Sequence, residues 1–238
     1  MKSKSDYLLF PTIAPLVFIF TTIACMFIYT GGTKFDHSAE GYTFLNNFFS
    51  DLGRIESWSG NSNYLSSALF CFACSFVSLS LIIYFKISID FFHHSNPTYK
   101  YIKLGAGLGI LAAFHFLGIG FAPGDILRDI HMYCVYVAFG SVILTGACYI
   151  PVVYNTNGFH NYYGHVLVAF LITTSIYFAI ISIGPPLDNP QGLKFQVISQ
   201  KVIIYIMMMN MSIQGYAMYQ FAKRKEELKS KAWLEENN

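Results

Sequence analysis

The stretch NNFFSDLGRIES, residues 46 to 57, contains the side chains of this sequence best suited to binding a ligand. Asn47 can donate and accept hydrogen bonds, Asp51 can accept them or carry a negative charge, and Arg54 can pair with a carboxylate or a phosphate. Such groups are unusual in a chain that is 54% hydrophobic and only 12% charged. The stretch is therefore either a polar connector or part of a ligand site.

A second polar stretch, APGDILRDIH, occupies residues 122 to 131. Its carboxylates and its histidine could act in acid–base catalysis or bind a metal, and its arginine could bind phosphate. Asp125 and Asp129 could instead cap the helix that follows, because the positive end of a helix favours carboxylates. Both interpretations stay open.

The overall composition indicates a protein that lies in lipid. Soluble domains are about 25% charged, whereas this chain has 12% charged residues and a mean hydropathy of +0.46. Its polar residues are too few to cover its apolar surface in water. The net charge is only +2, so we expect no binding of nucleic acid, which requires a basic surface.

Six apolar stretches are long enough to cross a membrane, which takes roughly 20 residues each. Backbone groups in lipid must be paired within a segment, so these stretches are expected to be helices. The predicted fold is all-α: one polytopic bundle of six transmembrane helices and a short interfacial helix in the first outer loop, forming a single domain over residues 1–238. The predicted spans are about 8–29, 62–86, 102–122, 132–154, 164–184 and 197–221.

The orientation follows from the positions of Lys and Arg, which favour the cytoplasmic side. If both termini are cytoplasmic, ten of the fifteen basic residues lie inside and five lie outside. The inner set is Lys2, Lys4, Lys86, Lys100, Lys103, Lys223, Arg224, Lys225, Lys229 and Lys231. The outer set is Lys34, Arg54, Arg128, Lys194 and Lys201. We therefore expect a protein of the cell membrane with the N- and C-termini in the cytoplasm.

This topology places the first, third and fifth loops, which are the most polar, at the outer face. His115 lies roughly 12 Å below that face at the helical rise and could form the floor of a cavity there. Polar groups are costly near lipid unless they are paired or face water, so they are either a ligand-binding cluster or interfacial caps. The candidate ligand-binding residues are Asn47, Ser50, Asp51, Arg54, His115, Asp125, Arg128, Asp129, His131, Gln200 and Lys201.

The first outer loop is expected to contain a short amphipathic helix that packs against the mouth of the bundle. The apolar residues of YTFLNNFFSDLG, residues 42–53, recur at spacings of three, four and seven. Gly53 is expected to end this helix with a positive φ. The Asp51 carboxylate is expected to point inward and to meet His131 or Arg128, because an isolated carboxylate at this depth would lose hydration. Otherwise, Asp51 caps its own loop and faces water.

Other patterns indicate packing and not chemistry. Cys71 and Cys74 form a CxxC motif, but it lies in mid-membrane without a second pair, which disfavours a zinc or redox site. Gly105 and Gly109 form a GxxxG motif that permits close packing of helices. No hydrolase, phosphate-binding or dinucleotide motif occurs, so no cofactor, metal or catalytic residue is assigned.

The motifs NNFFSDLGR and PGDILRDIHMYCVYVAF resemble the six-helix bacterial and archaeal membrane family called domain of unknown function 998. The matching elements are Ser50–Gly53, Pro123 with Asp125, and His131 at the head of the fourth helix. The chain is also distantly similar to the Frag1/DRAM/Sfk1 group of eukaryotic membrane proteins. The resemblance implies a six-span fold and a polar outer site, and the eukaryotic group is linked to lipid remodelling and distribution.

Three classes of function remain. The first is a lipid-handling or lipid-sensing protein whose Arg54, Arg128 and Lys201 meet a phosphate group. The second is a membrane-embedded, metal-dependent or acid–base lipid hydrolase or transferase that uses His115, His131 and the outer aspartates. However, the alkaline ceramidase and progestin-receptor-like families, which use such residues, carry a pair of histidines in their last span. The last span of this chain has no histidine. The third is a small-molecule transporter. We favour the first, with membrane lipids as partners and an oligomer or a partner membrane protein as a further option.

Overall fold

The computed structural model describes residues 4–92 and 98–236, and the part of the chain that it describes is helical without a β-strand. Lys2, one of the basic residues used above to orient the chain, lies outside the described residues. The structure contains six α-helices and two short 3-10 helices. They are η1 (Lys4–Leu8), α1 (Leu9–Ile28), η2 (Phe49–Gly53), α2 (Tyr64–Phe91), α3 (Tyr99–Phe121), α4 (Arg128–Tyr154), α5 (Asn161–Ile183) and α6 (Pro190–Glu236).

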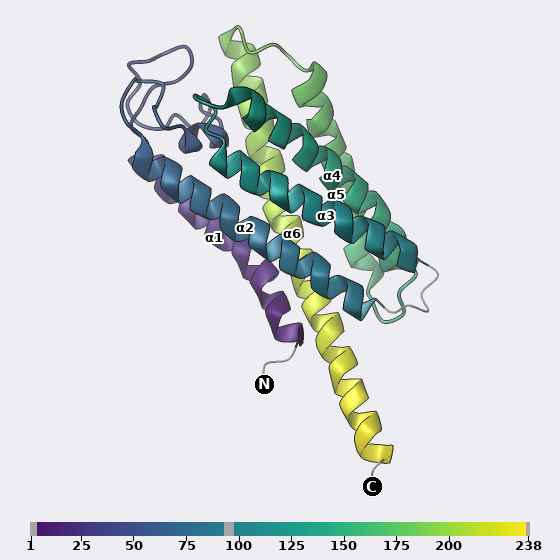
Figure 1. Ribbon diagram of the computed structural model, residues 1–238. Coiled ribbons are helices and arrows are strands. Elements are labelled where there is room, and N and C mark those ends of the chain that lie inside the picture. The colour runs from purple at the N-terminus through teal and green to yellow at the C-terminus, as the bar shows by residue number, and fades with distance from the viewer. Residues whose placement is uncertain (1–3, 93–97, 237–238) are drawn as a thin grey trace.

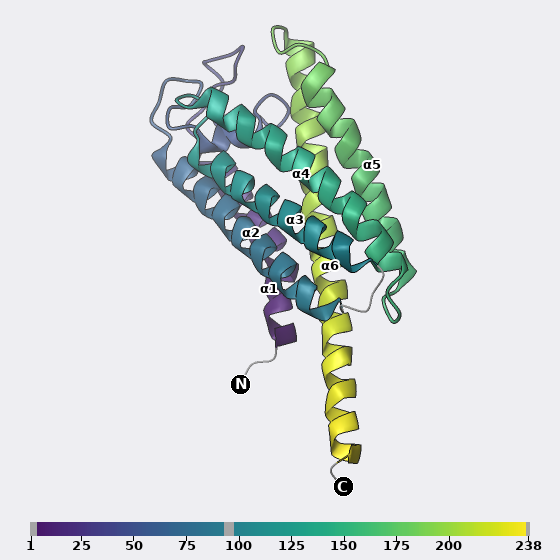
Figure 2. The same cartoon turned by 45° about the vertical axis from the view of Figure 1, so that its right-hand side comes forward.

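The six α-helices form a closed ring. Each helix packs against the next one in the chain, and α6 returns to pack against α1 (Figure 1). The start of α1 and the end of α6 lie at one end of the ring, which we call the terminal end. The connections after α1, α3 and α5 lie at the opposite end, which we call the loop end (Figures 1 and 2). The first, third and fifth loops, which were predicted to share one face, therefore lie at the same end of the ring.

Five of these helices, α1 to α5, are long and apolar enough to cross a membrane. Large apolar side chains on their outer surfaces are exposed, among them Phe20, Phe27, Ile176 and Ile183. Exposed apolar surface on this scale marks contact with lipid or another protein. Together, these features indicate an integral membrane protein, as the composition predicts.

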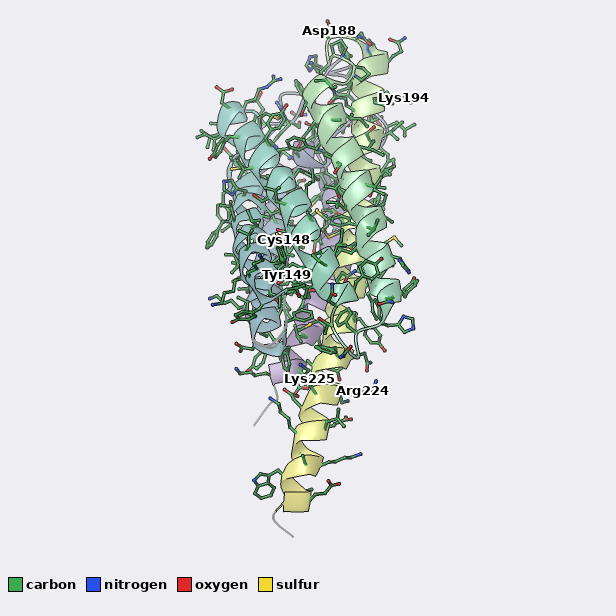
Figure 3. The ribbon with its side chains drawn as sticks, turned by 90° about the vertical axis from the view of Figure 1, so that its right-hand side faces the viewer. Cys148, Tyr149, Asp188, Lys194, Arg224 and Lys225 are labelled. Carbon is green, nitrogen blue, oxygen red and sulfur yellow. The ribbon has the colours of Figure 1, made fainter. Side chains whose placement is uncertain are left out.

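Helix α6 is more polar than the other five because Lys201, Asn210 and Gln214 interrupt its apolar sequence. All three side chains are buried inside the ring. The helix also continues beyond the ring at the terminal end, where Figure 3 shows Arg224 and Lys225 on the extension. These three polar residues of α6 thus lie within the protein, whereas its basic residues Arg224 and Lys225 lie past the end of the ring.

Close packing around α3 depends on the GxxxG motif. A side-chain carbon at Gly105 would lie 2.7 Å from the Tyr149 ring of α4, and one at Gly109 would overlap the Phe85 ring of α2. Both rings are buried. Each glycine therefore permits close packing of α3, Gly105 against α4 and Gly109 against α2.

We expect Gly109→Ala to lower the stability of the protein by about 1–3 kcal/mol, because the added methyl group overpacks the α2–α3 interface. Gly107→Ala, in the same helix, is the matched control because no atom lies within 4 Å of its added carbon. Thermal unfolding of the purified protein in detergent measures both. Equal melting temperatures for the two variants would contradict the role assigned to Gly109.

Candidate functional site

The segment between α1 and α2, residues 29–63, folds over the loop end of the ring, and we call it the first-loop cap. Its η2 helix inserts into the ring: Phe49 and Leu52 are buried, and the Phe49 ring lies 6.4 Å from that of Phe18 on α1 and 5.6 Å from that of Tyr205 on α6. The Phe49 amide donates to Gln200 Oε1 of α6 at 2.8 Å. The first outer loop therefore packs into the loop end of the ring.

The predicted helix over residues 42–53 is wrong in its extent, since only Phe49–Gly53 is helical. Asn47 explains the difference. Its buried side chain accepts a hydrogen bond from the Thr43 amide at 2.9 Å and donates to the Gly32 carbonyl at 3.0 Å. An asparagine that bonds to the backbone in this way competes with helix formation.

The predicted positive φ at Gly53 is also wrong. The glycines with positive φ in the described part of the chain are Gly31, Gly32, Gly41, Gly60 and Gly158. At Gly53, the requirement is space: a side-chain carbon there would lie 2.6 Å from Cδ1 of Phe70 on α2. The chain leaves η2 at Arg54 in an ordinary extended conformation.

Asp51 points inward and is only 6% exposed, but its hydrogen-bond partners are not the predicted ones. Its Oδ2 accepts from the Phe48 amide at 2.8 Å and from Asn47 Nδ2 at 3.4 Å, and its Oδ1 accepts from Trp58 Nε1 at 3.1 Å. Burial raises the pKa of the Asp51 carboxyl above its usual range, although these hydrogen bonds act in the opposite direction. Asp51 therefore organises the cap itself.

Lys201 attaches the cap to α6. Its ammonium group is buried and donates to the backbone carbonyl of Asn47. Three rings of the cap surround it, with centroids 5.3 Å (Tyr42), 4.9 Å (Phe44) and 5.6 Å (Phe49) from Nζ. Aromatic faces attract a cation most strongly when it is desolvated. This arrangement brings Lys201 to the cap as a structural anchor.

Asp125 joins the cap to the connection between α3 and α4. Its carboxylate accepts hydrogen bonds from the amides of Ile55 (3.1 Å) and Glu56 (2.9 Å). His131, expected to bind Asp51, instead bonds through Nδ1 to the carbonyl of Ala122 at 2.7 Å. The third loop therefore meets the first, but through Asp125 and backbone amides.

A cavity lies directly beneath the cap, and we call it the loop-end cavity. Its walls are mainly apolar side chains from all the helices except α5. Ser50, His131 and Gln200 also line it. These three candidate residues come from the cap, α4 and α6, and the structure brings them to one cavity.

The remaining candidate residues lie apart from this cavity. Arg54 stacks on the Trp58 ring at 4.0 Å, and Arg128 and Asp129 are exposed at the start of α4. His115 bonds to the carbonyl of Leu111 in its own helix, so it does not form the expected floor. Within residues 4–92 and 98–236, no three His, Cys, Asp or Glu side chains lie close enough together to hold a metal ion.

The sequence reasoning missed two features of the site. One is Trp58, which donates to Asp51 from seven residues along the chain. The other is the aromatic surround of Lys201, formed by Tyr42, Phe44 and Phe49. The sequence reasoning placed only Tyr42 and Phe49, and only on the apolar face of a helix. The position of Lys201 inside the predicted span 197–221 could have indicated this surround, because a charged side chain within a span must find partners there.

No protein-family model, curated protein or solved structure matches this chain. The resemblance to domain of unknown function 998 and to the Frag1/DRAM/Sfk1 group stays a prediction.

We expect Asp51→Asn to loosen the cap without unfolding the ring. An amide has one acceptor oxygen where the carboxylate has two, so the Phe48 amide or Trp58 Nε1 loses its partner, at a cost of about 1–3 kcal/mol. Hydrogen exchange in detergent should show faster exchange in residues 43–58 and unchanged exchange in α2 to α5. Asp188→Asn, at an exposed position in the connection between α5 and α6, is the control. Unchanged exchange in the cap of Asp51→Asn would contradict the role of this carboxylate.

Trp58 should report the protonation of Asp51 directly. The chain has two tryptophans, so Trp233→Phe leaves Trp58 as the single fluorophore. Its emission should change with a midpoint above the usual aspartate pKa of about 3.9, because burial disfavours the charged carboxylate. Because the folded protein binds this proton more tightly than the unfolded chain does, protonation of Asp51 stabilises the folded cap. The stabilisation is complete below the unfolded-state pKa and is lost as the pH rises through the folded-state pKa. The transition should be missing in Asp51→Asn, and its persistence would assign it to another group.

Proposed function

We propose that the protein is a lipid-binding membrane protein of six spans that holds a lipid in the loop-end cavity. In this proposal, α6 is the sixth span, the cap lies at the membrane–water interface, and the loop end faces away from the cytoplasm. The observation that carries it is the composition of the cavity. Its walls are apolar, whereas Ser50, His131 and Gln200 supply hydrogen-bonding groups beneath the cap.

The chemistry of these three groups favours a lipid whose polar part is uncharged. A hydroxyl and an amide carry no charge, and His131 already bonds to the backbone through one ring nitrogen. They suit a hydroxyl, carbonyl or amide of the ligand.

A phosphate-bearing headgroup is less well supported than the sequence suggests. Of the three basic residues expected to meet phosphate, Lys201 is enclosed by the cap and already bonded to Asn47. Arg54 and Arg128 lie toward the surface, so neither lines the loop-end cavity. The loop end thus offers an enclosed site for neutral groups. Lipid binding would also agree with the eukaryotic proteins that the chain distantly resembles.

The test is to fill the loop-end cavity. Ile204 lines it, and Ile204→Phe should occupy the space that the ligand needs. Overpacking by about 1–3 kcal/mol corresponds to a loss of bound lipid of roughly fivefold to a hundredfold. Ile198→Phe makes the same change on an exposed part of α6 and should have no effect.

The readout is mass spectrometry of lipids extracted from the protein purified in mild detergent, in moles per mole of protein. Wild type and Ile198→Phe should carry the same neutral, hydroxyl- or amide-bearing lipid class, and Ile204→Phe should lack it. Lipid that matches the bulk membrane in all three samples would refute specific binding in this cavity.

A further inference from the structure

A second cavity lies deeper in the ring, between α2, α3, α4, α5 and α6, and we call it the central cavity. Val77, Phe116, Met207 and Met208 line both cavities, so the central cavity adjoins the loop-end cavity. Figure 3 shows Tyr149, another of its lining residues, on the half of α4 nearer the terminal end. The two cavities therefore lie next to each other inside the ring.

The wall of the central cavity contains one buried oxygen atom that lacks a partner among the described residues. Asn210 of α6 is only 9% exposed, and its Oδ1 atom has no hydrogen-bond partner among the described residues. By contrast, Thr145, Tyr149 and Gln214 in the same wall each form a hydrogen bond within the protein. A buried carbonyl oxygen without a partner is unfavourable, so Asn210 calls for a hydrogen-bond donor in the cavity.

Lipid chains usually offer no donor at this depth. Gln200, at the loop-end cavity, and Asn210 are ten residues apart, which is about 15 Å along a helix, or half the thickness of the hydrocarbon core. A group that meets Asn210 therefore lies near the middle of a lipid chain whose polar end lies beneath the cap. A hydroxyl is the simplest such group, because it donates to the amide oxygen and adds little volume.

We propose that the central cavity holds the hydrocarbon chain of a lipid that carries a hydroxyl group within that chain, and that Asn210 recognises this hydroxyl. This inference rests on the proposed lipid binding and adds a second, deeper determinant of specificity. An apolar chain gains little by moving from the bilayer into an apolar cavity, since both surroundings are hydrocarbon. The hydrogen bond to Asn210 is therefore what distinguishes a hydroxylated chain from a plain one.

The experiment offers the purified full-length protein an equimolar mixture of monostearin and hydroxystearin, the same monoglyceride with a hydroxyl at the twelfth carbon of its chain. Native mass spectrometry measures the ratio of the two bound species. Wild type should prefer hydroxystearin by about threefold to tenfold, the range of a hydrogen bond between polar groups in a membrane. Asn210→Leu should bring the ratio to about one while monostearin still binds. Met209→Leu, which changes an exposed residue next to Asn210 on the outer surface of α6, should keep the preference.

A third lipid tests the hydrogen bond without altering the protein. The methyl ether of hydroxystearin has similar bulk but cannot donate, so wild type should not prefer it to monostearin. A wild-type ratio near one, or a preference that persists in Asn210→Leu or for the ether, would overturn the role of Asn210. If monostearin binding is still blocked by Ile204→Phe in those cases, the proposed function stands. If neither monoglyceride binds, this inference fails, and the lipids that co-purify with wild type and Ile204→Phe decide the proposed function separately.

Discussion

An ammonium group removed from water is the constraint on which the loop end depends. Lys201 lies on a helix that packs within the ring, where a charge without partners would be very unfavourable. The cap supplies those partners: the carbonyl of Asn47 and the faces of three aromatic rings. Because the partners belong to residues 42–49, that segment must lie on α6, and this position places Phe49 and Ser50 over the loop-end cavity.

Much of the fold could be predicted from the sequence, because the cost of exposing backbone groups to lipid leaves helices as the only solution for long apolar stretches. The positions of the helices and the gathering of three loops at one end followed from this. The polar residues of α6 were harder to interpret. Asn210 and Gln214 make that helix resemble a poorer span, yet both are buried inside the ring. Only the arrangement of the helices shows which way a polar side chain faces.

The details of the site could not be predicted because they depend on competition between local hydrogen bonds. The periodicity of residues 42–53 indicates a helix, but the Asn47 side chain bonds to the backbone and limits the helix to η2. Asp51 was correctly expected to point inward, but it accepts a hydrogen bond from Trp58 of its own loop. The predicted partner, His131, bonds to the backbone of Ala122 instead. The cavities exist only because six helices close into a ring, and no spacing within one helix encodes such a space.

Closure of the ring by its first and last helices has a consequence for how the protein is made. Helix α6 is synthesised last, and until it reaches α1 the cavity walls are incomplete. The cap, in contrast, leaves the ribosome early, about 150 residues before its anchor; Phe49 and Gln200, which bond to each other, are separated by 151 positions. During that interval, η2 can pack against α1, α2 and α3 but lacks its contacts with α6. The cap of the nascent protein is therefore held from one side only until α6 arrives.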